Sequence, residues 1–325
     1  MKNPKRILII KLGAIGDVVH SMIIPEAVKQ KYPDCEIHYL TSDKISEMLE
    51  ENPLIDKLYR WNGEKKGLIQ ILYTAFLFLY NRYDVIFNLT HSTKTFLLSY
   101  LAFPKVVMNK KDGDFSWVEN YFHIAKKIMP DLTLPSRLNL TVGAKETEKI
   151  SDILKNHIRP YVIFSPAGSA DKNRQGRVWN IKKWQELADK IKSEYGGTIF
   201  VCGVENEIEV HSKLCNVEIL TGKFKLKETA AFIAQADLVI SGDTGLSHIA
   251  SALDRYTVML TGSTSPDKIK PYGDKGFCVD TPYKCKHCWQ KKCKHELIDE
   301  VYTPCMEAIT SDMVMDLVKK EGFLK

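Results

Sequence analysis

The feature that most constrains this chain is an alternation of short apolar strands with amphipathic helices, which begins at the N-terminus and restarts midway. The segments Lys5–Lys11 and Tyr161–Ser165 each contain an unbroken run of β-branched and other apolar residues. Such runs are typical of parallel strands covered on both faces. In Ile181–Tyr195 the apolar residues recur at helical spacing. The alternation predicts an α/β fold built from parallel sheets.

The two series of elements predict two domains. Strands are expected at 5–11, 36–40, 54–60, 83–89 and 106–108, with helices at 18–31, 45–51, 68–80 and 93–103. After them, strands are expected at 161–165, 198–202, 217–220, 238–241 and 256–260, with helices at 181–195, 227–235, 247–253 and 311–320. A chain of 325 residues is longer than one core usually supports. We place the domains at 1–159 and 160–325, because the residue before Pro160 tends to leave the helical region.

The longest apolar stretch, Leu68–Tyr80, is too short to span a membrane and contains Gln70. It is predicted as a buried helix, with contact to a bilayer surface as the alternative. The N-terminus could be misread as a signal peptide, but Lys11 and Asp17 interrupt its apolar run. We therefore expect a cytoplasmic protein.

The formal net charge of +6 is concentrated in one segment. Residues 57–127 hold eleven Lys and Arg against five Asp and Glu. A basic surface of this kind attracts nucleic acid, anionic lipid or an acidic sugar, although it can also be a solvated face without a partner. A nucleic-acid-binding module using 57–127 is the alternative of another class. It is disfavoured because basic and aromatic residues do not interleave and no RNA-binding or helix-turn-helix motif is found.

A glycine-containing turn, Gly13–Asp17, follows the first strand and opens a helix. It is not the dinucleotide-binding fingerprint, because the third glycine is missing and no suitable acid follows on the next strand. Asp17 has two interpretations. It caps the helix, or it is a carboxylate that accepts a proton from a sugar hydroxyl.

A second turn, Ser241–His248, joins a strand to a helix in the C-terminal half. The amides of Thr244, Gly245 and Leu246 would point at an anion, helped by the helix dipole. Asp243 could fix the turn or hydrogen-bond a sugar hydroxyl. A lone helical histidine such as His248 is often a packing residue, so its role stays open at this point.

A third candidate site follows the first strand of the C-terminal half. There a turn with Gly168 and Ser169 leads through a polar loop to Arg177. A guanidinium at this position could neutralise a diphosphate with two parallel hydrogen bonds. Lys172 and Arg174 in the same loop compete for that role.

Four cysteines cluster near the C-terminus, with the spacing Cys285-x2-Cys288-x4-Cys293-x11-Cys305. Four thiols in one loop could bind a structural zinc or iron ion. The alternatives are free thiols or an adventitious disulfide. A catalytic metal is not expected, since all four ligands would come from the protein.

Taken together, four segments resemble the ADP-heptose:lipopolysaccharide heptosyltransferases, glycosyltransferase family 9. They are ILIIKLGAIGDVVHS at Ile7–Ser21, RVWNIKKWQEL at Arg177–Leu187, SGDTGLSHIASAL at Ser241–Leu253 and TGSTSP at Thr261–Pro266. The resemblance implies a GT-B fold, in which two Rossmann-like domains enclose a cleft with the active site. It also implies inverting, metal-independent transfer of a heptose from ADP-heptose to an acidic saccharide of the lipopolysaccharide inner core.

Site residues carry over from the family position by position. Asp17 matches the catalytic base, and Lys94 matches a basic position facing the acceptor. Arg177 stands where the family usually has a lysine on the donor phosphate, a departure that leaves Lys172 or Arg174 as candidates. The remaining donor-binding positions are Gly16, Gly168, Ser169, Glu205, Asp243, Thr244, Gly245 and His248.

The resemblance also implies partners. The donor would be ADP-heptose, and the acceptor an anionic glycolipid such as Kdo-lipid A, met by peripheral contact at the inner face of the inner membrane. No nucleic-acid partner and no catalytic cofactor are expected, and the cysteine cluster is shared by only some family members. Another sugar nucleotide or a protein acceptor remains an alternative. The last helix could pack back on the N-terminal domain.

Overall fold

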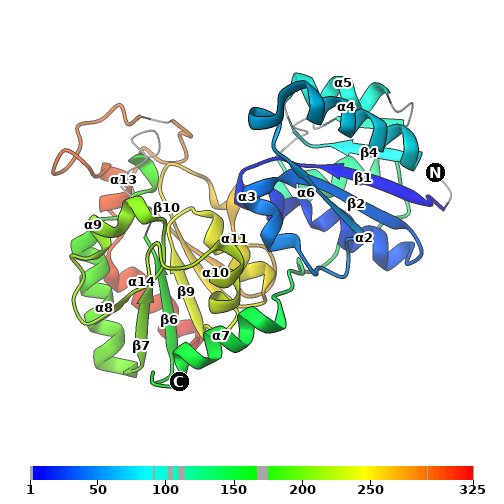
Figure 1. The fold of residues 1–325 in the computed structure, drawn as a ribbon. Coiled ribbons are helices and arrows are strands. Elements are labelled where there is room, and N and C mark those ends of the chain that lie inside the picture. Colours follow the sequence, from blue (N-terminus) through cyan, green and yellow to red (C-terminus); the bar gives the residue numbers. More distant parts are fainter. Residues whose placement is uncertain are drawn as a thin grey trace. The chain divides into compact units, whose positions relative to one another are not determined.

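The computed structural model describes residues 3–90, 92–101, 105–108, 114–166, 175–290 and 292–324; for 63–70, 100, 101, 105–108 and 175 only the backbone is described. The chain divides into two compact units, Met1–Thr141 and Val142–Lys325. Each unit is a parallel sheet with helices on both faces (Figure 1). The predicted α/β class with parallel sheets is therefore confirmed.

The first unit contains a five-stranded sheet in the order β3-β2-β1-β4-β5. Its strands are β1 (Arg6–Ile10), β2 (Glu36–Ser42), β3 (Lys57–Trp61), β4 (Val85–Asn88) and β5 (Lys105–Met108). Its helices are α1 (Ile15–Ser21), α2 (Ile23–Lys31), α3 (Asp43–Ser46), α4 (Gly63–Asn81), α5 (Thr93–Leu101) and α6 (Trp117–Lys126). A 3-10 turn, Glu47–Leu49, follows α3.

The two faces of this sheet have different covers. Leu8 and Ile86 share one buried cluster with Phe78 of α4 and Leu98 of α5. On the opposite face, α6 packs against α1 and α2, as Figure 1 shows. Because alternate residues of one strand point to opposite faces, coverage on both sides explains the continuously apolar strand sequences.

The second unit contains a six-stranded sheet in the order β11-β10-β9-β6-β7-β8. Its strands are β6 (Tyr161–Ser165), β7 (Thr198–Val201), β8 (Glu218–Ile219), β9 (Leu238–Ser241), β10 (Tyr256–Thr261) and β11 (Gly276–Asp280). Its helices are α7 (Ala144–Leu154), α8 (Ile181–Tyr195), α9 (Ile208–His211), α10 (Leu226–Ile233), α11 (Gly245–Ala252), α12 (Pro266–Ile269), α13 (Pro304–Glu307) and α14 (Ser311–Glu321). Two 3-10 turns, Gln175–Arg177 and Glu205–Glu207, stand before α8 and α9.

The core of the second unit lies between its sheet and the helices α8 and α14. Trp184 of α8 is fully buried and packs on Phe164 and Trp179. Val314 and Val318 of α14 belong to the same cluster. The last helix, for which packing on the N-terminal domain was considered, thus buries its apolar face in its own unit, because that face completes the cover over α8.

The boundary between the two units falls at Thr141–Val142, before α7. The sequence analysis placed the domain boundary after this helix, at 159–160. Two ion pairs tie α7 to α10. Lys149 Nζ lies 2.7 Å from Glu228 Oε1, and Lys227 Nζ lies 2.9 Å from Glu146 Oε1. Helix α7 therefore belongs to the second unit.

The stretch Leu68–Tyr80 forms a helix, but the prediction that this helix is buried is wrong for one of its faces. Phe78 of α4 is buried against the sheet, whereas Leu72, Phe76 and Tyr80 are 62%, 62% and 75% exposed. The physical reason is that nearly every residue of α4 from 71 to 80 is apolar, and the sheet can cover only one side. In the described ranges no helix is long and apolar enough to cross a membrane.

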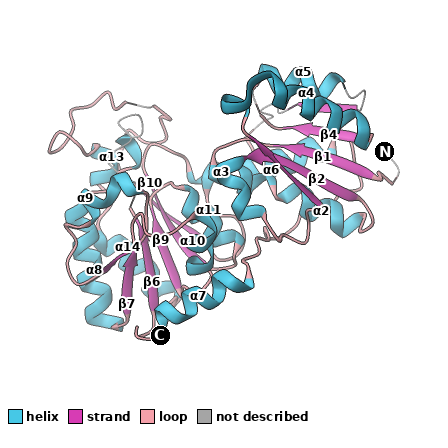
Figure 2. Cartoon of the chain, viewed as in Figure 1, coloured by secondary structure: helices cyan, strands magenta, loops and turns pink. Residues whose placement is uncertain are grey.

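Between β11 and α13 the chain runs as a long loop with little regular structure (Figure 2). A single bridge between Ile298 and Tyr302 interrupts it. This segment carries Cys285, Cys288 and Cys293. Its conformation is therefore held by contacts of individual side chains and amides rather than by a sheet ladder.

Candidate active site

Each sheet has one point where its strand order reverses. In the first unit β2 and β3 extend the sheet to one side of β1, and β4 then pairs on the other side. In the second unit β7 and β8 extend to one side of β6, and β9 pairs on the other. Ligands of open parallel sheets bind outside the carboxyl ends of strands at such points. A ligand is therefore expected at these two edges.

At the β1–β4 edge the structure brings together Asp17 and a lysine that the sequence analysis did not select. Lys11 Nζ lies 2.8 Å from Asp17 Oδ2 and 3.4 Å from the carbonyl oxygen of Leu89. The Lys11 side chain is buried at 8% exposure, whereas that of Asp17 is 41% exposed. A buried ammonium needs a partner, so this ion pair holds the carboxylate at the edge while leaving it within reach of a ligand.

The helix-cap interpretation of Asp17 is wrong. The N-cap of α1 is Ala14, and Asp17 lies within the first turn with its carboxylate on Lys11. Gly16 stands beside it in α1 and is half-buried. The backbone around this turn is held to the segment directly after β4, since the Leu12 amide donates to Thr90 Oγ1 at 3.0 Å.

Two phenols lie near this carboxylate, and neither competes with it as a base. Burial raises the pKa of Tyr39 and of Tyr121, and the negative charge of Asp17 raises both further. Both hydroxyls therefore stay protonated at neutral pH. The Lys11 ammonium also lies 5.9 Å from the centre of the Tyr121 ring.

Lys94 lies in the first turn of α5, the helix that follows β4, and its side chain is exposed. Because β1 and β4 are parallel, α1 and α5 both begin at the carboxyl edge of the sheet. Lys94 and Asp17 thus belong to the same edge.

At the β6–β9 edge the structure joins two of the predicted donor-binding elements. Arg177 Nε lies 3.0 Å from Asp243 Oδ2, and the Asp243 side chain is only 7% exposed. Ser165 at the end of β6 reaches the turn after β9, with its Oγ 3.4 Å from Thr244 Oγ1. Arg177 therefore stands beside the start of α11.

The N-terminus of α11 has the form of an anion site. Thr244 is its N-cap, and the Thr244 side chain makes no capping hydrogen bond to the first-turn amides. The Thr244 hydroxyl lies 2.9 Å from Ser241 Oγ instead. Gly245 opens the helix, and the first-turn amides with the helix dipole favour a negative group there. His248 is buried one turn further along α11.

The 3-10 turn carrying Arg177 is anchored on the loop after β10. The Ser263 amide and hydroxyl both donate to the carbonyl oxygen of Gly176, at 3.2 and 3.1 Å. A Cβ at Gly176 would lie 2.4 Å from the Ser263 side chain. Position 176 therefore requires glycine, and the close approach fixes the turn that carries Arg177.

Glu205 lies in the 3-10 turn after β7 and is exposed. The neighbouring His211 is fully buried, and burial lowers its pKa to about 4, so it is neutral at pH 7. Its Nδ1 lies 2.7 Å from Thr221 Oγ1. Gly168, Ser169, Lys172 and Arg174, also predicted for the donor phosphate, lie outside the described residues.

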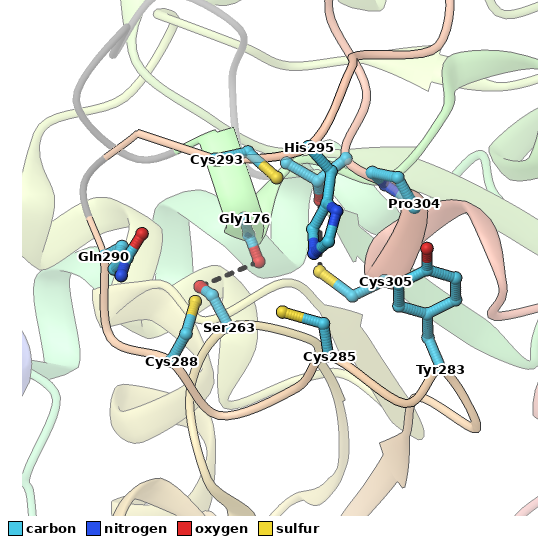
Figure 3. A pocket seen from close by; sticks show the side chains of 11 residues that line it. Gly176, Ser263, Tyr283, Cys285, Cys288, Gln290, Cys293, His295, Pro304 and Cys305 are labelled. Carbon is cyan, nitrogen blue, oxygen red and sulfur yellow. Dashed lines mark hydrogen bonds between the residues drawn. The ribbon is translucent and has the colours of Figure 1, made fainter.

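The cysteine loop folds around a small cavity of about 20 Å³ (Figure 3). All four predicted thiols line it, together with His295 and Gly176. The Nε2 atom of His295 is buried without a hydrogen-bond partner in the described chain. The four thiols are unbridged, so the disulfide alternative is wrong here.

The thiol and imidazole groups around this cavity suit a soft metal ion, but they do not have the geometry of a metal site. Among the described residues, no three His, Cys, Asp or Glu side chains are positioned to hold a metal. The loop also touches the donor edge, since the amides of His287 and Trp289 donate to the carbonyl oxygens of Gly262 and Ser263. Ser263 in turn donates to the carbonyl oxygen of Gly176, so the cysteine loop supports the turn at Gly176 through the backbone of residues 262 and 263.

Comparison with known proteins decides the family. Residues 72–298 match the model of glycosyltransferase family 9 (heptosyltransferase). The chain belongs to this family. A curated relative, lipopolysaccharide heptosyltransferase 1 of Campylobacter coli, is 25% identical over 311 residues, which cover 80% of this chain and 84% of the relative.

Solved structures of family 9 and related proteins share the fold. The family 9 glycosyltransferase of Veillonella parvula matches with a TM-score of 0.80 at 18% identity, covering 98% of this chain and 97% of its own. TibC of enterotoxigenic E. coli, an iron-containing heptosyltransferase solved with ADP-D-beta-D-heptose, matches with a TM-score of 0.62 at 16% identity. That match covers 98% of this chain and 76% of TibC.

These findings confirm three predictions about the family 9 chain. The resemblance to the heptosyltransferases is correct, the fold is GT-B, and the protein is a glycosyltransferase of the lipopolysaccharide heptosyltransferase family. They leave the individual site residues as predictions. The residue at the Asp17 edge that sequence reasoning did not select is Lys11, whose signal was a charged side chain directly after the buried run Ile7–Ile10.

Proposed function

We propose that this glycosyltransferase moves a heptose from ADP-heptose to an acidic saccharide of the lipopolysaccharide inner core, with inversion at the anomeric carbon. The donor-binding part of this proposal rests on the Arg177–Asp243 ion pair, which lies beside the start of α11, where the N-cap side chain makes no capping hydrogen bond. A guanidinium and a row of helix amides form a pair of groups that suits a diphosphate.

On the donor side, Asp243 gives the cation a buried ion-pair partner, since its Oδ2 lies 3.0 Å from Nε of Arg177. The contact is an electrostatic one, because this oxygen has no hydrogen-bond partner among the described residues. The amides of Gly245 and Leu246 then bind phosphate oxygens, and Thr244 adds a hydroxyl. Negative charge that develops on the leaving diphosphate is stabilised by groups already in place. Glu205 contacts the nucleoside in this scheme.

On the acceptor side, Asp17 acts as the general base. Lys11 fixes one carboxylate oxygen at 2.8 Å, and Lys94 attracts the negative charge of the acceptor. Asp17 takes the proton from the acceptor hydroxyl, and the oxygen attacks the anomeric carbon while the bond to the diphosphate breaks. One displacement of this kind inverts the configuration. The proton ends on Asp17 and the electron pair of the broken bond on ADP.

A screen of nucleotide sugars tests the donor assignment. ADP-heptose at about one hundred times its dissociation constant should stabilise the protein by about 2.7 kcal/mol, and UDP- and GDP-sugars should give much smaller shifts of the melting temperature. Transfer to a Kdo-containing acceptor, followed by NMR of the new anomeric centre, reports the inversion. Stabilisation by a different nucleotide sugar, or transfer only to a protein, would replace this assignment with the corresponding alternative.

We further propose that Cys285, Cys288, Cys293 and Cys305 bind one structural zinc or iron ion. The support is chemical, because four thiols and the unpartnered His295 Nε2 line one cavity, and thiolates favour such metals. The iron in TibC agrees with this chemistry. The metal would hold the loop together and leave the reaction to the residues above.

Elemental analysis tests the metal. Protein purified without added metal or chelator should carry about one zinc or iron per chain, and Cys288→Ser should lose it. Cys215→Ser is the matched control, since Cys215 is an exposed thiol outside the loop. A metal-free protein whose melting temperature is unchanged by a strong chelator would overturn the site.

A further inference from the structure

Residues 286–289 of the cysteine loop form a turn, called here the edge turn, at the carboxyl end of β10. The amides of His287 and Trp289 donate to the carbonyl oxygens of Gly262 and Ser263, at 3.0 and 2.9 Å. Gly262 and Ser263 are the first two residues after β10. The edge turn therefore lies at the carboxyl edge of the second sheet, where ligands of parallel sheets bind.

Asp280, the last residue of β11, holds the same turn from a second strand. Its Oδ2 lies 3.0 Å from Lys286 Nζ, and its Oδ1 lies 2.9 Å from His287 Nε2. His287 and Trp289 adopt φ values of 56° and 55°, in a region that bulky residues rarely enter. Such strain persists only where surrounding contacts impose it, and it is frequent at ligand sites. The edge turn is thus held in one conformation by two strands.

The side chain that this turn exposes is the indole of Trp289. Cys288 and Gln290 on either side of it line the cysteine cavity, whereas Trp289 does not (Figure 3). Its side chain is 43% exposed. Among the residues that the structure describes, no ring packs on the indole and no group hydrogen-bonds to it. The indole is therefore available to a ligand.

Hydrogen bonds connect the edge turn to the turn that carries Arg177. Ser263, which accepts from the Trp289 amide, donates from its own amide and hydroxyl to the carbonyl oxygen of Gly176 (Figure 3). Gly176 directly precedes Arg177, whose Nε lies 3.0 Å from Asp243 Oδ2. Trp289 and the proposed diphosphate site therefore belong to one connected part of the same sheet edge.

The strand order β11-β10-β9-β6-β7-β8 predicts where each part of a nucleotide sugar lies. Arg177 and the start of α11 follow β6 and β9, Glu205 follows β7, and Trp289 lies against the end of β10. Three strand spacings, or about 14 Å, separate the ends of β7 and β10. In an extended nucleotide sugar, the nucleoside and the sugar lie on opposite sides of the diphosphate. With the nucleoside at β7, the sugar lies at β10.

We propose that Trp289 contacts the sugar of the nucleotide-sugar donor and contributes to the selection of that sugar. The inference rests on the proposed function, because it takes the position of the diphosphate from it. The face of an indole carries negative partial charge, which attracts the weakly positive C–H groups on one face of a sugar ring. The indole Nε1–H is also a donor for a sugar hydroxyl. Adenine is the competing occupant, and it is disfavoured because Glu205 assigns the nucleoside to β7.

Isothermal titrations of ADP-heptose and of ADP into the whole chain test this contact. Trp289→Ala should bind ADP-heptose about tenfold more weakly than the native protein, as expected for the loss of one aromatic contact, and should bind ADP with native affinity. Trp289→Phe should retain most of the affinity for ADP-heptose, because an aromatic ring remains. Ile298→Ala is the matched control, since Ile298 is an apolar side chain of the same loop that is 39% exposed. It should bind both ligands as the native protein does.

Tryptophan fluorescence gives a second readout. ADP-heptose should change the emission of the native protein more than ADP does, and Trp289→Phe should show no such difference. Native affinity of Trp289→Ala for ADP-heptose would overturn the proposal. Equal weakening of ADP-heptose and ADP would also overturn it: a matching loss for adenosine would assign the indole to adenine, and native affinity for adenosine would mean that Trp289 only supports the turn through Ser263.

The titrations separate this inference from the proposed donor. Failure of the native protein to bind ADP-heptose would count against the donor. Binding of ADP-heptose that is equally tight in the native protein and in Trp289→Ala would count against Trp289 alone. If another nucleotide sugar is the ligand, the same comparison with that sugar nucleotide and its own diphosphate decides the role of Trp289.

Discussion

Asp17→Asn should lower the rate of sugar transfer by about a thousandfold, the middle of the range for removal of a general base. The reason is that the amide cannot accept the proton of the acceptor hydroxyl. Its carbonyl oxygen can still accept a hydrogen bond from Lys11, which lies 2.8 Å from the native carboxylate. The asparagine variant therefore avoids leaving a buried ammonium without any partner, which would itself destabilise the fold. Steady-state transfer rates with saturating donor measure the effect.

The controls separate chemistry from folding and binding. Asp34→Asn removes an exposed carboxylate from the same unit and should transfer at the native rate. ADP should raise the melting temperature of Asp17→Asn and native protein equally, because the donor groups lie in the other unit. Native turnover by Asp17→Asn would remove Asp17 as the base. A rate loss accompanied by lost ADP stabilisation would indicate a structural role.

Elements with a continuous apolar run or a regular apolar stripe could be predicted from the sequence, whereas one short helix without so plain a pattern could not. The strands β1, β6 and β9 and the helix α8 were expected within two residues at each end, because continuous apolar runs and a regular apolar stripe determine them. Helix α6 was missed, although Ser116 and Glu119 form a capping box at its start. That signal is local, short and easily overlooked beside a polar segment.

The site shows the same limit in another form. Glycine turns after apolar strands predicted the two edges at Asp17 and at Asp243–Gly245, since a turn that follows a parallel strand lies at the carboxyl edge of its own sheet. The sequence did not reveal which side chains contact those carboxylates, because these contacts depend on which strands pair. Arg177 meets Asp243 only because β9 lies beside β6. The exposure of Phe76 likewise depended on the sheet covering one side of α4, which composition alone does not reveal.

Arg177→Ala should lower kcat/KM by about a hundredfold, the lower part of the range for losing one group that stabilises developing charge. The leaving diphosphate would lose a guanidinium whose Nε lies 3.0 Å from the Asp243 carboxylate. Arg177→Lys should recover part of the activity, because lysine keeps the positive charge, but a point charge cannot replace a planar fork. Lys182→Ala, at a side chain that is 80% exposed in the same unit, should behave as the native protein.

Comparing the binding of ADP with that of adenosine distinguishes a contact of Arg177 with phosphate from a purely structural role. Arg177→Ala should weaken binding of ADP by at least about tenfold, as expected for a lost charge-assisted contact, and leave binding of adenosine unchanged. Isothermal titration of both ligands measures this. Equal weakening of ADP and adenosine would mean that Arg177 only supports the turn through Asp243. Selective weakening of ADP, with a salt dependence smaller than that of the native protein, would assign the diphosphate to Arg177, because screening acts on a charge pair that the variant lacks.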